Sequence, residues 1–159
     1  MAAEQRQDVL YLEDLAVGRT FTSRTYVMEP ERIKAFAEEF DPQPFHLDPE
    51  AAQQSFFQGL AASGWHTSAV IMRLLVESVP LAHGLIGANS EVTWPRATRP
   101  GDVLRVISTI KENAPSNSRP DRGWVIIESI ALNQDDEICQ RTRSRVLAFR
   151  RDAAERAAT

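Results

Sequence analysis

The sequence is poor in cysteine and has neither an excess of positive charge nor a long apolar run, and each absence excludes a class of protein. Its one cysteine, Cys139, cannot form an intrachain disulfide, and no spacing of cysteine and histidine is typical of a zinc site. The net charge of −4 argues against nucleic acid or an anionic membrane as a partner, since both need clustered positive charge. No apolar stretch approaches the roughly 20 residues that span a bilayer.

What is present is typical of one globular domain. The 159 residues fit a single domain, and an apolar fraction of 43% is enough for a core. Residues 1–9 are polar and lack the apolar core of a signal peptide, so we expect a flexible tail and a cytoplasmic protein. A second polar tail is expected at residues 151–159, which leaves residues 10–150 as the folded domain.

A strand followed by short helices is predicted in the first half of the chain. Residues 20–28 are rich in threonine and in aromatic and β-branched residues, which predicts the strand. Residues 30–40 predict an amphipathic helix with proline in its first turn. It ends before Asp41, because the proline that follows disfavours a helical conformation there. A second helix is expected over residues 49–56, with Asp48 as its N-cap.

The most informative segment is a predicted helix over residues 65–79 that is apolar on nearly every face. Only Arg73 and Glu77 are charged, at a spacing that lets them pair. Such a helix must be buried almost all round, which in a chain of this size requires a sheet wrapped around it.

The rest of the chain is predicted to be antiparallel sheet. Four strands follow the helix, over residues 85–94, 103–112, 123–133 and 137–149. A hairpin turn is expected at residues 133–136 and a longer loop at residues 113–122. Helices beside a run of strands predict the α+β class, and one apolar helix held by a curved sheet of about five strands is the hotdog fold.

The segment from Phe40 to Pro49 combines two titratable groups with a stiff backbone. Asp41 and His46 lie five residues apart, and prolines on both sides of Gln43 restrict the chain between them. A preorganised pair of this kind suits acid–base catalysis, for which the pKa of histidine is near neutrality. From these residues alone, the simpler interpretation is that Asp41 ends a helix and that His46 is a hydrogen-bonded loop histidine.

Together with two later segments, this stretch resembles the MaoC-like dehydratase family, which includes the (R)-specific enoyl-CoA hydratases. The family's motif is Asp, any residue, usually Asn, Pro, an apolar residue, His, any residue and Asp. Here it reads Asp41-Pro42-Gln43-Pro44-Phe45-His46-Leu47-Asp48. Residues 60–67 resemble the family's entry into its central helix, and residues 94–102 resemble its Pro-Gly-Asp turn, so the resemblance covers residues 10–150.

The resemblance implies that Asp41 and His46 hold one water and add it to a 2-enoyl-CoA, or remove it from a 3-hydroxyacyl-CoA. Backbone N–H groups at the start of the central helix, near His66 and Thr67, would stabilise the thioester oxygen. The candidate substrate-binding residues are Gln43, Gly64, Trp65, His66, Thr67 and Arg96. Gln43 replaces the usual asparagine and Thr67 a common glycine, which leaves the size of the substrate open.

Two other functions stay open: hydrolysis of an acyl-CoA thioester, and binding of acyl-CoA without turnover. The implied reaction needs no metal or redox cofactor, since coenzyme A enters only as part of the substrate. Five strands around one helix leave a sheet edge unpaired, and hotdog relatives pair two sheets edge to edge. We therefore expect at least a homodimer.

Overall fold

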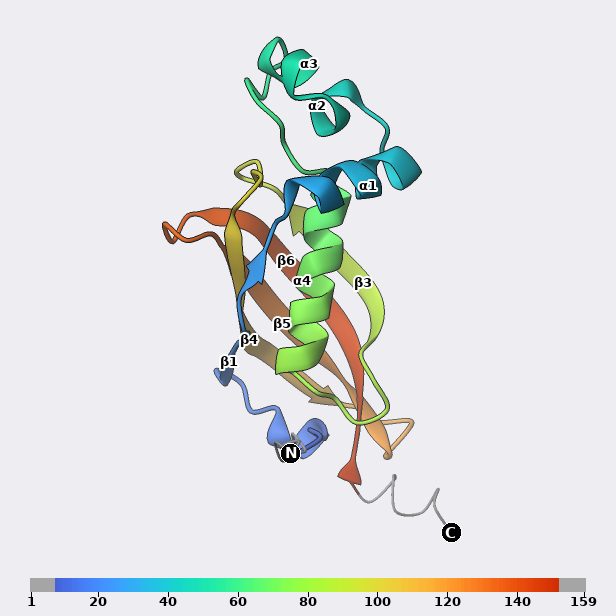
Figure 1. Ribbon diagram of the computed structural model, residues 1–159. Helices are drawn as coiled ribbons and strands as arrows, with labels where there is room; N and C mark the ends of the chain where they lie inside the picture. Colours follow the sequence, from blue (N-terminus) through green and yellow to red (C-terminus); the bar gives the residue numbers. More distant parts are fainter. Residues whose placement is uncertain (1–7, 152–159) are drawn as a thin grey trace, which may run out of the picture.

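One curved antiparallel sheet wraps around a single long helix in the computed structural model, which describes residues 8–151. Figure 1 shows helix α4 (Gly64–Ser78) lying along the concave side of the strands. The predicted α+β hotdog fold is thereby confirmed. Apart from Asp8, Val9 and Arg151, the predicted terminal tails lie outside the described residues.

The sheet contains six strands, in the order β1, β4, β5, β6, β3, with β2 paired to β4 as well. Their bounds are Thr20–Thr22 for β1, Tyr26–Val27 for β2, Ile86–Thr93 for β3, Val103–Pro115 for β4, Arg122–Leu132 for β5 and Ile138–Phe149 for β6. The last four correspond to the predicted strands, but the loop predicted at residues 113–122 is shorter than expected. Pro115 still pairs with Gly123, where a side chain would lie 2.7 Å from the carbonyl oxygen of Ala114. A glycine at that position lets the two strands approach this closely.

The strand predicted over residues 20–28 is two short strands, because the ladder to β4 is interrupted at Ser23. The N–H of Ser23 donates to the carbonyl oxygen of Val106 at 2.9 Å. The N–H of Val106 donates to the Ser23 hydroxyl at 2.8 Å rather than to a backbone carbonyl. A side-chain oxygen thus replaces a backbone acceptor, which is the usual way serine competes with regular structure.

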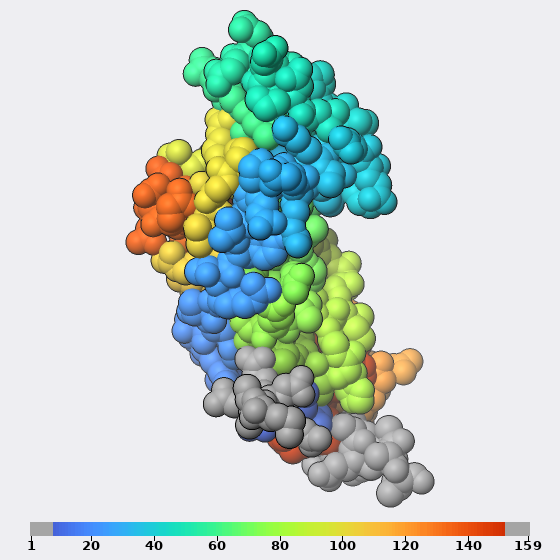
Figure 2. Space-filling view, viewed as in Figure 1, coloured from blue at the N-terminus to red at the C-terminus, as the bar shows by residue number. Residues whose placement is uncertain are grey.

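Three helices between β2 and α4 form a lobe at one end of the sheet. They are α1 (Pro30–Phe40), α2 (Pro44–Leu47) and α3 (Pro49–Gln53), and each begins with proline in its first turn. Figure 2 shows this lobe standing out beyond the body of the molecule. Helix α2 was not predicted. The helix predicted over residues 49–56 ends early, because the Ser55 hydroxyl donates to the carbonyl oxygen of Ala52 at 2.6 Å and turns the chain.

Helix α4 packs one face on the sheet and leaves the other open. Its inward residues, such as Leu74 and Leu75, are buried in two apolar clusters that together form the core. The predicted pair between Arg73 and Glu77 forms at 3.0 Å. The prediction that α4 is buried on nearly all sides was wrong for the single chain. The sheet covers only one side of this helix, and Met72 and Val76 are about half exposed. Within residues 8–151, no helix is long and apolar enough to cross a membrane.

Candidate active site

The turn between α1 and α2 brings an aspartate and a histidine together. Asp41 is the C-cap of α1, where its N–H donates to the carbonyl oxygen of Ala37 at 2.9 Å. The N–H of Gln43 then donates to the Asp41 carbonyl at 2.7 Å, and α2 returns His46 toward the end of α1. As a result, His46 Nε2 lies 3.3 Å from Asp41 Oδ2. The chain thus reverses between α1 and α2, which brings the two side chains together.

A backbone carbonyl fixes which nitrogen of His46 faces Asp41. His46 is 4% exposed, and its Nδ1 lies 2.6 Å from the carbonyl oxygen of Ala61. Since a carbonyl oxygen can only accept, Nδ1 carries a proton, and Nε2 is the nitrogen at which the ring can gain or lose one. That exchangeable position is directed toward Asp41.

The carboxylate of Asp41 is held in its charged form. Burial raises the pKa of Asp41, but hydrogen bonds from Ser63 and Gln43, together with His46, outweigh it and leave the pKa below its ordinary value. The Gln43 amide donates to Asp41 Oδ1 at 2.6 Å, which leaves Oδ2 directed at His46. Gln43 therefore orients the carboxylate, as an asparagine at this position of the motif also could.

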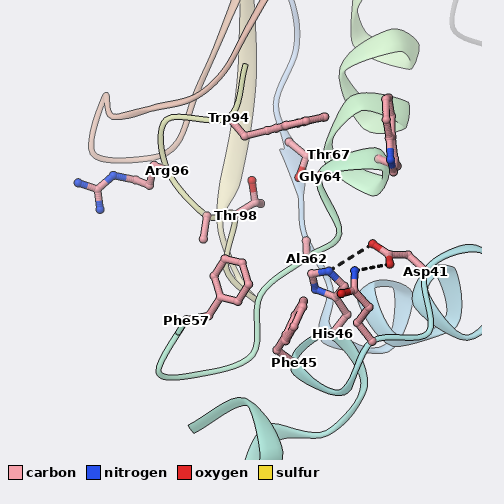
Figure 3. Close-up of a pocket in the computed structure, with 13 residues that line it drawn as sticks. Asp41, Phe45, His46, Phe57, Ala62, Gly64, Thr67, Trp94, Arg96 and Thr98 are labelled. Carbon is pink, nitrogen blue, oxygen red and sulfur yellow. Dashed lines mark hydrogen bonds and ion pairs between the residues drawn. The ribbon is translucent and has the colours of Figure 1, made fainter. Parts of the chain in front are cut away.

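Both groups open into a cavity of about 350 Å³ with a mainly apolar lining. Figure 3 shows Asp41 and His46 on one side, Phe45 and Phe57 at one end and Trp94 at the other. The lining residues are Asp41, Gln43, Phe45, His46, Phe57, Ala62, Gly64, Trp65, Thr67, Trp94, Arg96, Ala97 and Thr98. The cavity thus brings together seven of the eight residues singled out in the sequence, namely Asp41, Gln43, His46, Gly64, Trp65, Thr67 and Arg96.

The profile of the MaoC like domain matches residues 14–122, which carry the motif, α4 and the turn after β3. The chain belongs to the MaoC-like domain family. A crystal structure of the MaoC-like dehydratase from Rhodospirillum rubrum is 59% identical, with a TM-score of 0.87 over 89% of this chain and 98% of that one. Membership in this family supports a hydratase or dehydratase as the general class of enzyme.

Two more distant relatives of this MaoC-like chain resemble it over most of their length. The unliganded (R)-hydratase PhaJ1 from Pseudomonas aeruginosa has a TM-score of 0.72 and 22% identity, over 89% of this chain and 87% of that one. That identity shows the shared fold alone. The uncharacterized protein YdeM of Bacillus subtilis is 28% identical over 127 residues, which are 79% of this chain and 89% of YdeM.

In this MaoC-like domain, two backbone donors at the start of α4, the N–H groups of Gly64 and His66, make no hydrogen bond to any of the described residues. Of these two residues, only Gly64 lines the cavity. The N–H of Trp65 donates to the Ser63 hydroxyl, which caps the helix at 3.2 Å. The expectation that Thr67 offers its N–H to a thioester is wrong, because this N–H already donates to the Ser63 carbonyl at 3.1 Å.

His66 is the candidate that the structure places away from the cavity. Its imidazole stacks on Phe36 of α1, with ring centroids 4.8 Å apart and an angle of 10° between the planes. Burial lowers the pKa of His66, and the nearby positive charge of Arg32 lowers it further. His66 thus packs α4 against α1 and is neutral at pH 7.

Several residues support the site from segments outside the motif at residues 41–48. Phe57 lines the cavity, while its neighbour Phe56 is almost fully exposed. Ser63 and Ala61 act on Asp41 and His46 from the segment before α4. Arg99 is directed at the backbone of residues 57–60. Such contacts join segments far apart in the chain, so no local pattern predicts them.

Proposed function

We propose that this protein catalyses the reversible hydration of a 2-enoyl-CoA to a 3-hydroxyacyl-CoA. One observation carries the proposal: Nε2 of His46 and a carboxylate oxygen of Asp41 lie 3.3 Å apart and face one cavity. In the neutral form of His46 that catalysis requires, both atoms are acceptors, and two acceptors this close repel each other unless a proton donor lies between them. A water molecule that donates one hydrogen to each satisfies both.

The chemistry follows from that water. As its oxygen bonds to the β-carbon, neutral His46 takes one of its protons at Nε2, and Asp41 stabilises the imidazolium that forms. The proton then passes from Nε2 to the α-carbon, on the same face of the former double bond. One water is consumed and both catalytic groups return to their starting states, so the same steps in reverse describe dehydration.

The thioester oxygen gains negative charge as water adds, and Gly64 supplies the donor for it. Its N–H is free, and it lies at the amino end of α4, where the helix dipole favours negative charge. Losing such a donor costs about 3–4 kcal/mol of barrier in comparable enzymes. Trp65 and Thr67 line the same end of the cavity and would contact the substrate through their side chains.

Arg96 is the positive group at the mouth of the cavity. Figure 3 shows its guanidinium directed away from Asp41 and His46, and it pairs with Glu137 at 2.7 Å. Because it is half-exposed, it can exchange this partner for a phosphate of coenzyme A, for which a guanidinium fork is well suited. The proposed steps use only water, two side chains and a backbone N–H, so they need no cofactor besides the coenzyme A of the substrate.

We also propose that the protein forms a homodimer through β3 and the open face of α4. Strand β3 is at the edge of the sheet, and nearly all its residues are exposed. Trp65, Met72 and Val76 form an exposed apolar stripe on α4. An unpaired edge beside an apolar stripe favours pairing with a second copy. A mass measurement in solution tests this, and a monomer at micromolar concentration would contradict it.

The hydration of a 2-enoyl-CoA is measured from the loss of its conjugated-thioester absorbance. We expect the wild type to be active, and Asp41→Asn and His46→Gln to lose about 10²–10⁴-fold in kcat. Asp48→Asn is the matched control: Asp48 caps α3 through the N–H of Glu50, and asparagine caps equally well. Circular dichroism shows whether each variant is folded.

Other outcomes separate the alternatives. Full activity in both Asp41→Asn and His46→Gln would end the catalytic assignment of the pair. Release of free thiol from an acyl-CoA, without hydration of any enoyl-CoA, would identify a thioesterase instead. Binding of acyl-CoA with no turnover of either kind would identify a binding protein.

A further inference from the structure

A buried glutamine connects one wall of the cavity to the sheet. Gln140 of β6 is 2% exposed. Its side-chain oxygen accepts from Trp94 Nε1 at 2.9 Å and from Ser68 Oγ at 2.8 Å, and its Nε2 donates to Thr142 Oγ1 at 2.9 Å. Since an indole N–H can only donate, the amide oxygen must face Trp94. Gln140 therefore links Trp94, the residue after β3, to Ser68 of α4.

The indole that Gln140 holds lies directly against Gly64. A Cβ at position 64 would lie 2.9 Å from Cε2 of Trp94 and 3.1 Å from its Cδ2. This close approach requires glycine there as long as the ring keeps its place. Figure 3 shows the ring crossing the cavity beside Gly64 and Thr67. Because Trp94 is still 41% exposed, burial does not hold the ring, and its hydrogen bond to Gln140 becomes important.

We propose that Trp94 limits the length of the acyl group that the cavity accepts, and that Gln140 is a positioning residue that holds Trp94 in this role. The inference rests on the proposed function, since it places the thioester oxygen at the N–H of Gly64. An acyl chain bound there meets the indole at once. If the ring swings aside, the buried oxygen of Gln140 loses one of its two donors and keeps only the Ser68 hydroxyl, and this loss opposes the movement. The substrate class is therefore short-chain 2-enoyl-CoA.

Kinetics with two substrates test the limit on acyl length. We compare kcat/KM for a four-carbon and an eight-carbon 2-enoyl-CoA. The measured quantity is kcat/KM for the eight-carbon substrate divided by kcat/KM for the four-carbon substrate. In Trp94→Ala we expect this ratio to rise about tenfold or more, because a pocket discriminates by at least that much per methylene group. Gln140→Met keeps the length of the side chain but removes the acceptor, and we expect a smaller rise. An unchanged ratio in a folded Trp94→Ala variant, or an equal rise of KM for both substrates, overturns the limit.

The matched control is Trp124→Phe. Trp124 lies on β5 with the guanidinium carbon of Arg145 4.1 Å from its ring centroid, and it does not line the cavity. We expect this variant to keep the wild-type ratio of kcat/KM. A ratio that changes as much in Trp124→Phe as in Trp94→Ala would show a general effect of tryptophan loss and would overturn the assignment to Trp94.

An NMR spectrum of the indole N–H groups tests the role of Gln140 without any turnover. The Trp94 signal is identified by its absence in Trp94→Phe. We expect it to shift and to exchange faster with solvent in Gln140→Met, while the Trp124 signal stays in place. An unshifted Trp94 signal overturns the positioning role alone. A wild type that hydrates neither substrate overturns the proposed function and the acyl limit with it.

Discussion

The guanidinium of Arg99 lies 2.6 Å from the carbonyl oxygen of Phe57, although the two residues are 42 positions apart. It also donates to the carbonyl oxygens of Gly59 and Leu60, at 2.9 and 3.3 Å. The next residue, Ala61, offers the carbonyl that fixes the proton on Nδ1 of His46. Arg99 thus holds the segment that carries both a wall of the cavity and the hydrogen-bond partner of His46.

Replacing Arg99 by lysine should therefore affect both stability and catalysis. A lysine ammonium is a point charge and cannot hold three carbonyls in the fork geometry of arginine. We expect the free energy of unfolding to fall by about 1–3 kcal/mol and kcat/KM to fall as well, measured by urea denaturation and enoyl-CoA hydration. Arg105→Lys is the control, since Arg105 pairs with the exposed Asp136. Equal losses in both variants would contradict the role assigned to Arg99.

Adding one methyl group at Gly64 should destabilise the protein through Trp94. The new Cβ would lie 2.9 Å from the indole, and forcing an extra carbon into a packed site costs about 1–3 kcal/mol. In a Trp94→Ala background the same change should cost much less, because the space is free. Gly87→Ala is the control, since a Cβ there meets no atom within 4 Å. Urea unfolding of the wild type, Gly64→Ala, Trp94→Ala and the double variant measures these costs. If the two single losses of stability simply add in the double variant, the indole is not what the new methyl group meets.

The charged form of Asp41 should make a contribution to stability that depends on pH. Its pKa in the folded protein is lowered from the ordinary 3.8, with burial opposing the shift and the hydrogen bonds from Ser63 and Gln43 prevailing. The stabilisation by Asp41 is thus fully present at a pH above its pKa in the unfolded chain. It is lost as the pH falls through its lower pKa in the folded protein. The stability difference between wild type and Asp41→Asn should be constant from pH 7 to 5 and shrink below 3.8. Thermal unfolding of both proteins across this pH range measures the stability difference. A difference that grows on acidification would contradict a lowered pKa of Asp41 in the folded protein.

His66 should make the fold sensitive to mild acid. The ring is 7% exposed and its folded pKa lies below the ordinary 6.5, because burial and then Arg32 disfavour the charged form. As pH falls through 6.5 the unfolded chain binds a proton before the folded chain does, so stability declines until the folded pKa is reached. His66→Phe keeps the stacking on Phe36 and should remove that decline. Stability measured against pH tests this. If the stability of His66→Phe declines with falling pH as steeply as that of the wild type, groups other than His66 cause the decline.

Local patterns in the sequence were enough for much of the fold. They predicted α4 and the strands β3 to β6, because an apolar stretch of helical length and the alternation in β4 have the periods of their elements. They overestimated the burial of α4, since Met72 and Val76 are about half exposed. The resemblance of residues 41–48 to the family's motif predicted the pair of Asp41 and His46, whereas the residues by themselves favoured a helix end and a loop histidine. The division of the strand at Ser23 was missed, because its cause is a hydrogen bond to Val106, which is 83 residues away.

The sequence by itself determined that an apolar helix packs on an antiparallel sheet and that Asp41 and His46 lie close together on a segment stiffened by prolines. Tertiary structure alone decided which nitrogen of His46 faces Asp41, through Ala61, and which N–H groups at the start of α4 lack a partner. It also decided that Trp94 bounds the cavity, through its bond to Gln140. The physical reason is that periodicity and proline act over a few neighbouring residues, whereas a cavity is closed by side chains that only the folded chain brings together.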